Sequence, residues 1–253
     1  RLVVVTAEGS RVEGGLVAGE GAAFLLAAMG GRKVRRAVGT ADGPREARVF
    51  AGDAAGAPAG SWPQGDAEAR AVLAQAVPEV MAQRGVSAPE AVAAILGPIG
   101  FRARARVRGA ASCVPVELRS GLSRADVEPV ACDFGYARFL AVEEHLLRHR
   151  RFDGYLSRPL RRAVMTSGDA VTVLPFDAAR GTVLLIEQFR AGPFARRDPH
   201  PWSLEAVAGR CDGMEPPEET ARREALEEAG LALGRLERIA GYYPTPGIAA
   251  EFI

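Results

Sequence analysis

Acidic side chains are concentrated between residues 209 and 231, in the stretch GRCDGMEPPEETARREALEEAGL. The stretch holds seven carboxylates and three arginines, although the whole chain has a formal net charge of only +1. Its carboxylates are Asp212, Glu215, Glu218, Glu219, Glu224, Glu227 and Glu228. Oxygen ligands of this kind suit Mg²⁺ or Mn²⁺, which bridge phosphate oxygens. The stretch is therefore a candidate site for phosphate chemistry assisted by a divalent cation.

The second half of this stretch is predicted to form a helix with three glutamates on one face. Pro217 suits the first turn of a helix, and Gly230 provides a C-terminal stop. Glu224, Glu227 and Glu228 stand at positions i, i+3 and i+4, so their carboxylates share a face. Like charges at this spacing weaken a helix by roughly a few tenths of a kcal/mol per pair, a cost that a bound cation would remove.

A solvated surface helix with arginine partners is the alternative reading of an acidic helix. The longer spacing favours the metal site, because nine positions fit the pattern G-x5-E-x7-R-E-U-x-E-E-x-G-U, where U is aliphatic. These positions are Gly209, Glu215, Arg223, Glu224, Ala225, Glu227, Glu228, Gly230 and Leu231. The stretch thus resembles the Nudix box. Ala225 is smaller than the usual aliphatic residue there, which suits a helix packed closely on a sheet.

Resemblance to the Nudix family implies an α/β/α sandwich whose strand–loop–helix unit holds the metal ions. The metal ligands would be the backbone carbonyl of Ala208 and the carboxylates of Glu224 and Glu228. Glu227 would be a further ligand or a supporting carboxylate, and Glu227 and Glu228 are assigned to the catalytic site. In the motif, Gly209 would allow a tight departure from the strand.

The same resemblance implies structural roles for the remaining motif residues. Arg223 would pair with Glu215 and fix the loop between strand and helix, and Gly230 would end the helix. Two or three Mg²⁺ ions would neutralise a diphosphate and activate a bound water, and Mn²⁺ could replace Mg²⁺.

Segments on both sides of the box indicate which class of diphosphate is the substrate. They occur in the order found in ADP-ribose pyrophosphatases, and the resemblance runs from about Tyr136 to the last residue. The segments are FDG (152–154), LPFD (174–177), LLIEQFR (184–190), PWSLEAVAG (201–209) and YPTPG (243–247). The implied reaction is hydrolysis of ADP-ribose to AMP and ribose 5-phosphate, although the box permits other nucleoside diphosphate sugars or dinucleotides equally.

Five residues are assigned to the substrate by their position in this resemblance. Arg190 would bind the diphosphate, a task suited to a guanidinium fork. Phe139 and Arg162 would sandwich the adenine, one from each subunit of a homodimer, although Phe139 could equally be an ordinary core residue. Glu205 lies at a position near the substrate, and Glu251 would reach the terminal ribose.

The ends of the chain limit this reading. The sequence opens with RLVVVT and closes with AEFI, both apolar runs typical of strands, so we expect a fragment of a longer protein. In the ADP-ribose pyrophosphatases the general base is a glutamate on a loop that follows the Pro-rich segment, which is YPTPG (243–247) in this chain. That loop would follow Ile253.

The elements that position the box are predicted to be strands, within a chain of α+β class. RRAVMT (161–166), AVTVLPF (170–176), TVLLIEQFR (182–190) and WSLEAVAG (202–209) alternate in the manner of strands. FLAVEEHLLRHRRF (139–152) fits either a strand or an amphipathic helix. We expect a Nudix domain over 136–253, truncated at its C-terminal end, a helical connector over 61–135 and a front region over 1–60.

In the front region, strands are predicted at 1–6, 12–17 and 47–52 and a helix at 19–31, followed by a Gly/Pro/Ala loop at 54–66. VEGGLVAGEGAAFLLAAMGG (12–31) and REARVFAG (45–52) resemble the later part of a γ-glutamylcyclotransferase-like domain. That domain joined to a Nudix module resembles the tellurite-resistance-associated Nudix proteins. A cyclotransferase glutamate is replaced by Met29-Gly30-Gly31, so the region is expected to be non-catalytic. In the connector, Ser87 is the expected N-cap and Gly97 the expected stop of a short helix.

Composition excludes several classes of function. A net charge near zero indicates neither nucleic acid nor an anionic membrane as partner, and no apolar run is long enough to cross a bilayer. The three cysteines, Cys113, Cys132 and Cys211, form no CxxC pair, so neither disulfides nor a zinc site is expected, and a reducing cytoplasm fits best. The three histidines (145, 149 and 200) show no ligand spacing and are assigned to surface or packing.

A sensor that binds ADP-ribose without cleaving it is the competing class of function. Such sensors tend to lose box glutamates and to carry a DNA-binding helical domain. The box glutamates are all present here, and the middle helices are not strongly basic, which favours the hydrolase.

Overall fold

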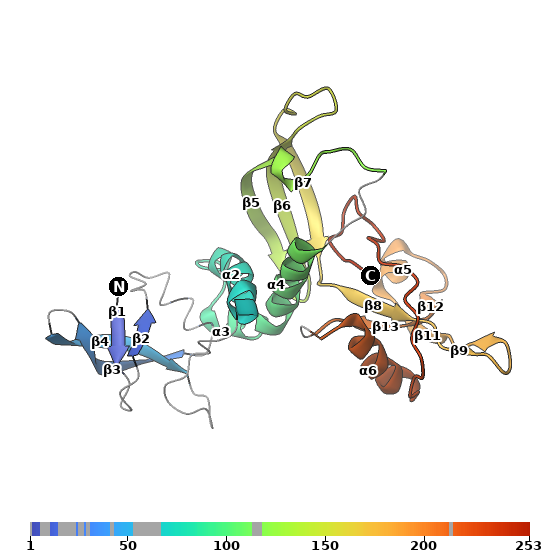
Figure 1. The fold of residues 1–253 in the computed structure, drawn as a ribbon, viewed down its shortest axis with the longest axis horizontal. Coiled ribbons are helices and arrows are strands. Elements are labelled where there is room, and N and C mark those ends of the chain that lie inside the picture. The colour runs from blue at the N-terminus through green and yellow to red at the C-terminus, as the bar shows by residue number, and fades with distance from the viewer. Residues whose placement is uncertain are drawn as a thin grey trace. The chain divides into compact units, whose positions relative to one another are not determined.

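The computed structural model describes residues 2–5, 11–14, 24, 28, 31–40, 43–52, 67–112, 118–212 and 215–253. The chain divides into two compact units, Arg1–Val107 and Arg108–Ile253 (Figure 1). Both helices and sheets occur, in agreement with the predicted α+β class. Among the described residues, no helix is both long and apolar enough to span a membrane.

Two antiparallel strand pairs belong to the first unit. Strand β1 (Leu2–Val5) pairs with β2 (Arg11–Gly14), and β3 (Gly31–Thr40) pairs with β4 (Gly43–Gly52) along its whole length. The strands predicted at 1–6, 12–17 and 47–52 overlap these elements, whereas β3 was not predicted because GRKVRRAVGT has few apolar residues. The loop predicted at 54–66 lies outside the described residues, and the cyclotransferase resemblance stays a prediction.

Three helices follow: α2 (Ala67–Ala82), α3 (Pro89–Ala93) and α4 (Leu96–Ala111), of which α4 runs past the end of this unit at Val107. Val80, Val92 and Ile99 are buried in one apolar cluster with Ala28, and Phe24 packs against it. Phe24 and Ala28, within the helix predicted at 19–31, are helical, whereas Gly31 at its predicted end already belongs to β3.

Two helix boundaries differ from the prediction. Ser87 is not the N-cap of α3: that position is Ala88, without a side-chain hydrogen bond, and the Ser87 hydroxyl donates to Gln83 Oε1 at 3.1 Å. The proline at residue 89 already fixes a helical φ angle, so the helix begins without a capping hydroxyl. Gly97 is not a stop either, because α4 begins at Leu96 and continues through it.

A three-stranded antiparallel sheet opens the second unit, in the order β5 (Val127–Ala137), β6 (Ala141–His149), β7 (Leu160–Thr166). The ambiguous segment 139–152 is therefore mainly a strand, and β6 is paired along both edges. The sheet begins at Val127, inside the range expected to be a helical connector. Register shifts at Pro129/Ala131 and Phe134/Tyr136 interrupt the alternation of side chains between the two faces of β5. The sequence therefore does not show the two-residue period by which a strand is recognised.

Shorter elements follow this sheet in the second unit. They are the strands β8 (Ala170–Val173), β9 (Phe176–Asp177), β10 (Thr182–Val183), β11 (Ile186–Phe189), β12 (Trp202–Glu205) and β13 (Val207–Arg210), and the helices α5 (Ala191–Arg196) and α6 (Pro217–Ala229), with a 3-10 turn at Arg124–Asp126 ahead of β5. Strand β8 pairs with β13, β9 with β10 and β11 with β12, all antiparallel. Helix α6 packs against β13 and β8, which places the acidic segment beside a sheet (Figure 1).

A buried ion pair joins α2 to α4 in the first unit. Arg102 Nε donates to both carboxylate oxygens of Glu79 at 3.1 Å, Arg102 Nη2 donates to Oε1, and the two side chains are 1% and 0% exposed. Removing one partner of such a pair leaves a buried charge without its counterion.

We expect Glu79→Ala to lower the free energy of unfolding by about 3–5 kcal/mol, because Arg102 would stay buried and charged. The exposed Glu90→Ala is the matched control and should change it by less than about 0.5 kcal/mol. Urea unfolding of both variants checks this. The interpretation is wrong if Glu79→Ala costs no more than the control.

Candidate functional site

Helix α6 carries the acidic segment and has the predicted ends. It begins at Pro217, and Gly230 caps its C-terminus in the left-handed conformation, at φ 64°. Ala221 and Ala225 are 3% and 0% exposed, on the side where α6 packs against β13 and β8. Small side chains let the helix backbone approach the sheet closely, so the structure explains why alanine stands at the aliphatic position of the motif.

Gly209 leaves room for the carboxylate of Glu224. A Cβ atom at residue 209 would lie 1.9 Å from Glu224 Cδ and 2.0 Å from its Oε1, far inside van der Waals contact. Gly209 is a regular residue of β13, opposite Val171 on β8, and its φ angle is not positive. The expectation that it allows a tight departure from the strand is therefore wrong: glycine is needed because a side chain from α6 lies against the strand.

Arg223 binds several acidic groups of the segment. The predicted pair with Glu215 is present, with Arg223 Nη2 3.5 Å from Glu215 Oε1. The guanidinium also contacts Glu224 at 2.8 Å and Glu227 at 3.2 Å, and it donates to the carbonyl of Arg210 at 3.2 Å. One arginine thus ties the loop, the end of β13 and the glutamate face of α6 together.

Thr220 adds a contact that the sequence did not indicate. It is fully buried on α6, and its hydroxyl donates to Glu215 Oε1 at 2.8 Å. Cys211 is 4% exposed next to it, and burial raises the pKa of the Cys211 thiol. The Cys211 amide donates to the carbonyl of Asp169 at 3.0 Å. Glu215 is therefore held from two sides, by Thr220 and by Arg223.

The electrostatic environment of Glu224 disfavours its charged form. Desolvation raises the pKa of this carboxyl, the charges of Glu227 and Glu228 act in the same direction, and the Arg223 hydrogen bond opposes them. A positive charge placed among the three carboxylates would reverse this balance.

Arg190 and Glu205 form a forked ion pair at the ends of β11 and β12. Arg190 Nε lies 2.8 and 3.0 Å from the two Glu205 oxygens, and Nη2 lies 2.6 Å from Oε2. This hydrogen bonding raises the pKa of Arg190 and lowers that of Glu205. The charge of Glu228 also raises the pKa of Arg190, so the pair lies within electrostatic reach of α6. Two residues predicted to contact substrate are thus brought together.

Phe139 and Arg162 lie on the three-stranded sheet. Phe139 stands between β5 and β6 and is 62% exposed, so the alternative reading of it as a core residue is wrong. The guanidinium of Arg210 lies over its ring, with Cζ 4.0 Å from the centroid. Arg162 is an exposed residue of β7 whose Nη1 donates to the carbonyl of Arg161 at 2.8 Å. Within one chain, the cation beside Phe139 is Arg210.

Glu251 is positioned beside the end of β7. Ala249 forms a parallel bridge with Met165, and the Ala250 amide donates to the Met165 carbonyl at 2.9 Å. The Ser167 hydroxyl donates to Glu251 Oε1 at 3.2 Å. The backbone pairing and this hydrogen bond fix where the Glu251 carboxylate lies.

The ligands predicted on β13 and α6 are chemically suited to a hard divalent cation. They would supply oxygen atoms only, from the carbonyl of Ala208 and the carboxylates of Glu224, Glu227 and Glu228. The Glu224 carboxylate occupies the space that a side chain at residue 209 would fill. Mg²⁺ and Mn²⁺ prefer such ligands.

We expect Gly209→Ala to weaken Mn²⁺ binding by tenfold or more, because the new methyl group would occupy the place of the Glu224 carboxylate. Gly234→Ala is the matched control, since a Cβ there would meet nothing within 4 Å. Titration calorimetry with Mn²⁺ on both variants measures the effect. Equal affinity of the Gly209 variant and the control would show that Glu224 does not need this space to bind metal.

Comparison with known proteins bears on the second unit. Residues 166–252 match the family model of the NUDIX domain. The chain is 38% identical over 137 residues to the ADP-ribose pyrophosphatase of Escherichia coli strain K12, covering 54% of this chain and 65% of that protein. It is also 38% identical over 110 residues to the GDP-mannose pyrophosphatase of Pectobacterium atrosepticum, covering 44% of this chain and 56% of that protein.

A solved structure, described as the crystal structure of an ADP compounds hydrolase, matches with a TM-score of 0.37 and 24% identity. The match covers 50% of this chain and 60% of that chain. The chain spans less than two thirds of the length of the curated relatives it matches. The box on β13 and α6 lies within the residues that match the NUDIX domain.

Proposed function

We propose that the protein hydrolyses the diphosphate of ADP-ribose to AMP and ribose 5-phosphate with the help of Mg²⁺. The observation that carries the proposal is the contact between Gly209 and Glu224, which a side chain at residue 209 would prevent. The 38% identity to an ADP-ribose pyrophosphatase supports the choice of substrate.

In this proposal the ligands come from β13 and α6. The carbonyl of Ala208 and the carboxylates of Glu224, Glu227 and Glu228 hold the ions. Mg²⁺ held by these residues would neutralise the diphosphate and lower the pKa of a water molecule. Arg223, which contacts Glu224 and Glu227, keeps these side chains oriented when no cation lies between them.

Arg190 recognises the diphosphate in this scheme. Its planar guanidinium already binds a carboxylate in forked geometry, and a phosphate group offers oxygens at similar spacing. Glu205 then acts as a stand-in for the substrate, holding Arg190 in place until the diphosphate replaces it. Glu251, close to the end of β7, contacts the terminal ribose.

We further propose a homodimer in which Phe139 of one subunit and Arg162 of the other enclose the adenine. The exposed ring of Phe139 supports a stacking role. Apolar side chains exposed on the second unit support a subunit interface, because monomers rarely leave such a cluster in water. They include Phe189, Phe194, Trp202 and Leu204, and the Phe189 ring contacts those of Phe194 and Trp202 at 5.9 and 5.7 Å.

We also propose a domain organisation, a location and a biological role for the protein. Residues 136–253 form an α/β/α Nudix sandwich, with the helices of 61–135 as connector and 1–60 as a non-catalytic part of a γ-glutamylcyclotransferase-like domain. The protein acts in the cytoplasm, and its domain order suits a role in tellurite resistance.

GDP-mannose hydrolysis is the second candidate, because the relative in Pectobacterium atrosepticum reaches the same identity over a shorter stretch. A screen of ADP-ribose, GDP-mannose and dinucleoside polyphosphates with Mg²⁺ separates the two activities. Binding of ADP-ribose without turnover of any of these compounds would instead support the sensor.

We expect Glu228→Gln to lower kcat for ADP-ribose by about 10²-fold or more, because losing a metal ligand removes several kcal/mol of transition-state stabilisation. Glu218→Gln, in the exposed first turn of the same helix, is the control and should keep its turnover. Steady-state kinetics, with unfolding curves to verify the fold, measure the effect. Turnover of the Glu228 variant near the wild-type value would remove Glu228 from the metal site.

We expect Phe139→Ala and Arg162→Ala each to raise the KM for ADP-ribose. If the two residues come from different subunits, mixing and re-equilibrating the two variants restores the wild-type KM at up to roughly one quarter of the sites. Mixed and unmixed samples are compared at equal total concentration. A mixture no more active than its components would show that no site combines Phe139 of one subunit with Arg162 of the other.

A further inference from the structure

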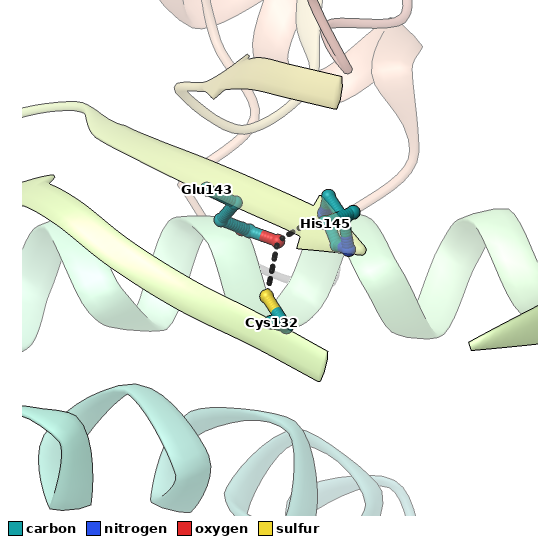
Figure 2. A group of neighbouring side chains, drawn as sticks. All are labelled: Cys132, Glu143 and His145. Atoms are coloured by element: carbon teal, nitrogen blue, oxygen red, sulfur yellow. Dashed lines mark hydrogen bonds and ion pairs between the residues drawn. The ribbon is translucent and has the colours of Figure 1, made fainter. Parts of the chain in front are cut away.

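Three side chains that can bind metal lie together on the sheet of the second unit, away from the acidic segment in sequence. They are Cys132 on β5 and Glu143 and His145 on β6 (Figure 2). Cys132 and His145 are direct cross-strand partners, and Glu143 lies two residues before His145. Cross-strand partners and residues two apart share a face of a sheet, so the register itself brings the three together.

The ligand atoms converge on one carboxylate oxygen. His145 Nε2 lies 3.1 Å from Glu143 Oε2, and Cys132 Sγ lies 3.9 Å from the same oxygen. One ligand atom from each of the three residues lies within 4.8 Å of the other two. In a tetrahedral Zn²⁺ site, with bonds of about 2.0–2.3 Å, neighbouring ligand atoms are about 3.3–3.6 Å apart. The distances of 3.1 and 3.9 Å bracket this range, so small side-chain rotations would suffice.

The carboxylate has a support that metal ligands commonly have. Glu143 is 5% exposed, and its other oxygen, Oε1, accepts a hydrogen bond from the Thr166 hydroxyl at 3.1 Å. Thr166 comes from β7 and is itself 8% exposed. This bond turns Oε2 toward Cys132 and His145, as outer-shell partners of metal ligands do.

We propose that Cys132, Glu143 and His145 bind one Zn²⁺ ion or a similar borderline cation. Sulfur, nitrogen and oxygen donors together suit Zn²⁺, whereas the oxygen donors of the acidic segment suit Mg²⁺. Three protein ligands leave a fourth position for water. The ion would fasten β5 to β6 close to the loop that carries Phe139. This site does not depend on the proposed hydrolase function.

Arg162 is the neighbour that opposes a cation here. It is the β7 partner of His145, so it stands beside the site on the same face of the sheet. Its charge lowers the affinity for a cation, and Arg162→Gln is expected to raise that affinity.

The test uses the full chain in saturating Mg²⁺, so that the oxygen sites are occupied, with Co²⁺ as a spectroscopic stand-in for Zn²⁺. Wild-type protein is expected to bind one equivalent of Co²⁺ with a thiolate charge-transfer absorption, and Zn²⁺ should displace it. Cys132→Ser should abolish the absorption, whereas Cys113→Ser, the matched cysteine control, should retain it. Glu228→Gln should also retain it, which separates this site from the acidic segment.

Two further variants test the geometry. His145→Gln should weaken Co²⁺ binding by tenfold or more, and Thr166→Val, which removes only the supporting hydroxyl, should weaken it by about 10–100-fold. Unfolding curves without Co²⁺ verify that each variant folds. The proposal is overturned if the wild-type protein shows no thiolate absorption, or if Cys132→Ser shows the same absorption. In that case Glu143 and His145 form an ordinary ion pair.

Discussion

The candidate site depends on a steric constraint: a carboxylate of α6 must lie directly against the backbone of β13. That arrangement requires glycine at 209, and the fully buried Ala225 brings the helix close to the sheet. A larger side chain at either residue would separate helix and strand, and the Glu224 carboxylate would move away from the β13 backbone at Gly209. The two elements proposed to carry the metal ligands are thus held together by the smallness of two residues that bear no charge.

Packing α6 closely against β13 concentrates the negative charge of several carboxylates in a small volume. Two arginines offset this charge. Arg223 contacts three glutamates and the end of β13, and Arg190 is held by Glu205 within electrostatic reach of Glu228. Arg223 neutralises carboxylates that are the proposed ligands of a divalent cation, and Glu205 holds the guanidinium that is proposed to bind the diphosphate. In the proposed hydrolase, this order would exist before substrate and metal bind, and it would reduce the reorganisation that catalysis must overcome.

Local features of the sequence predicted the acidic helix well. The ends of α6, the shared glutamate face and the Arg223–Glu215 pair follow from spacings within one helix and its loop. The steric role of Gly209 was not predictable, because it depends on a side chain fifteen residues later in the chain. Strand β5 was missed because its register shifts break the alternation of apolar residues, and the Glu79–Arg102 pair because packing alone brings α2 and α4 together.

The same reason explains why the sequence shows no ligand spacing for the histidines and no metal-binding pair for the cysteines. Metal ligands on one helix or turn leave a regular spacing in the sequence, whereas ligands on neighbouring strands are related only by the register of the sheet. Cys132 and His145 become partners through the pairing of β5 with β6, including the register shift between Phe134 and Tyr136. A one-residue change of that register would move one of them to the opposite face. A sulfur-containing site set by strand register and an oxygen-only site set by helix spacing select different cations, so the two can coexist in one unit without competing for the same ion.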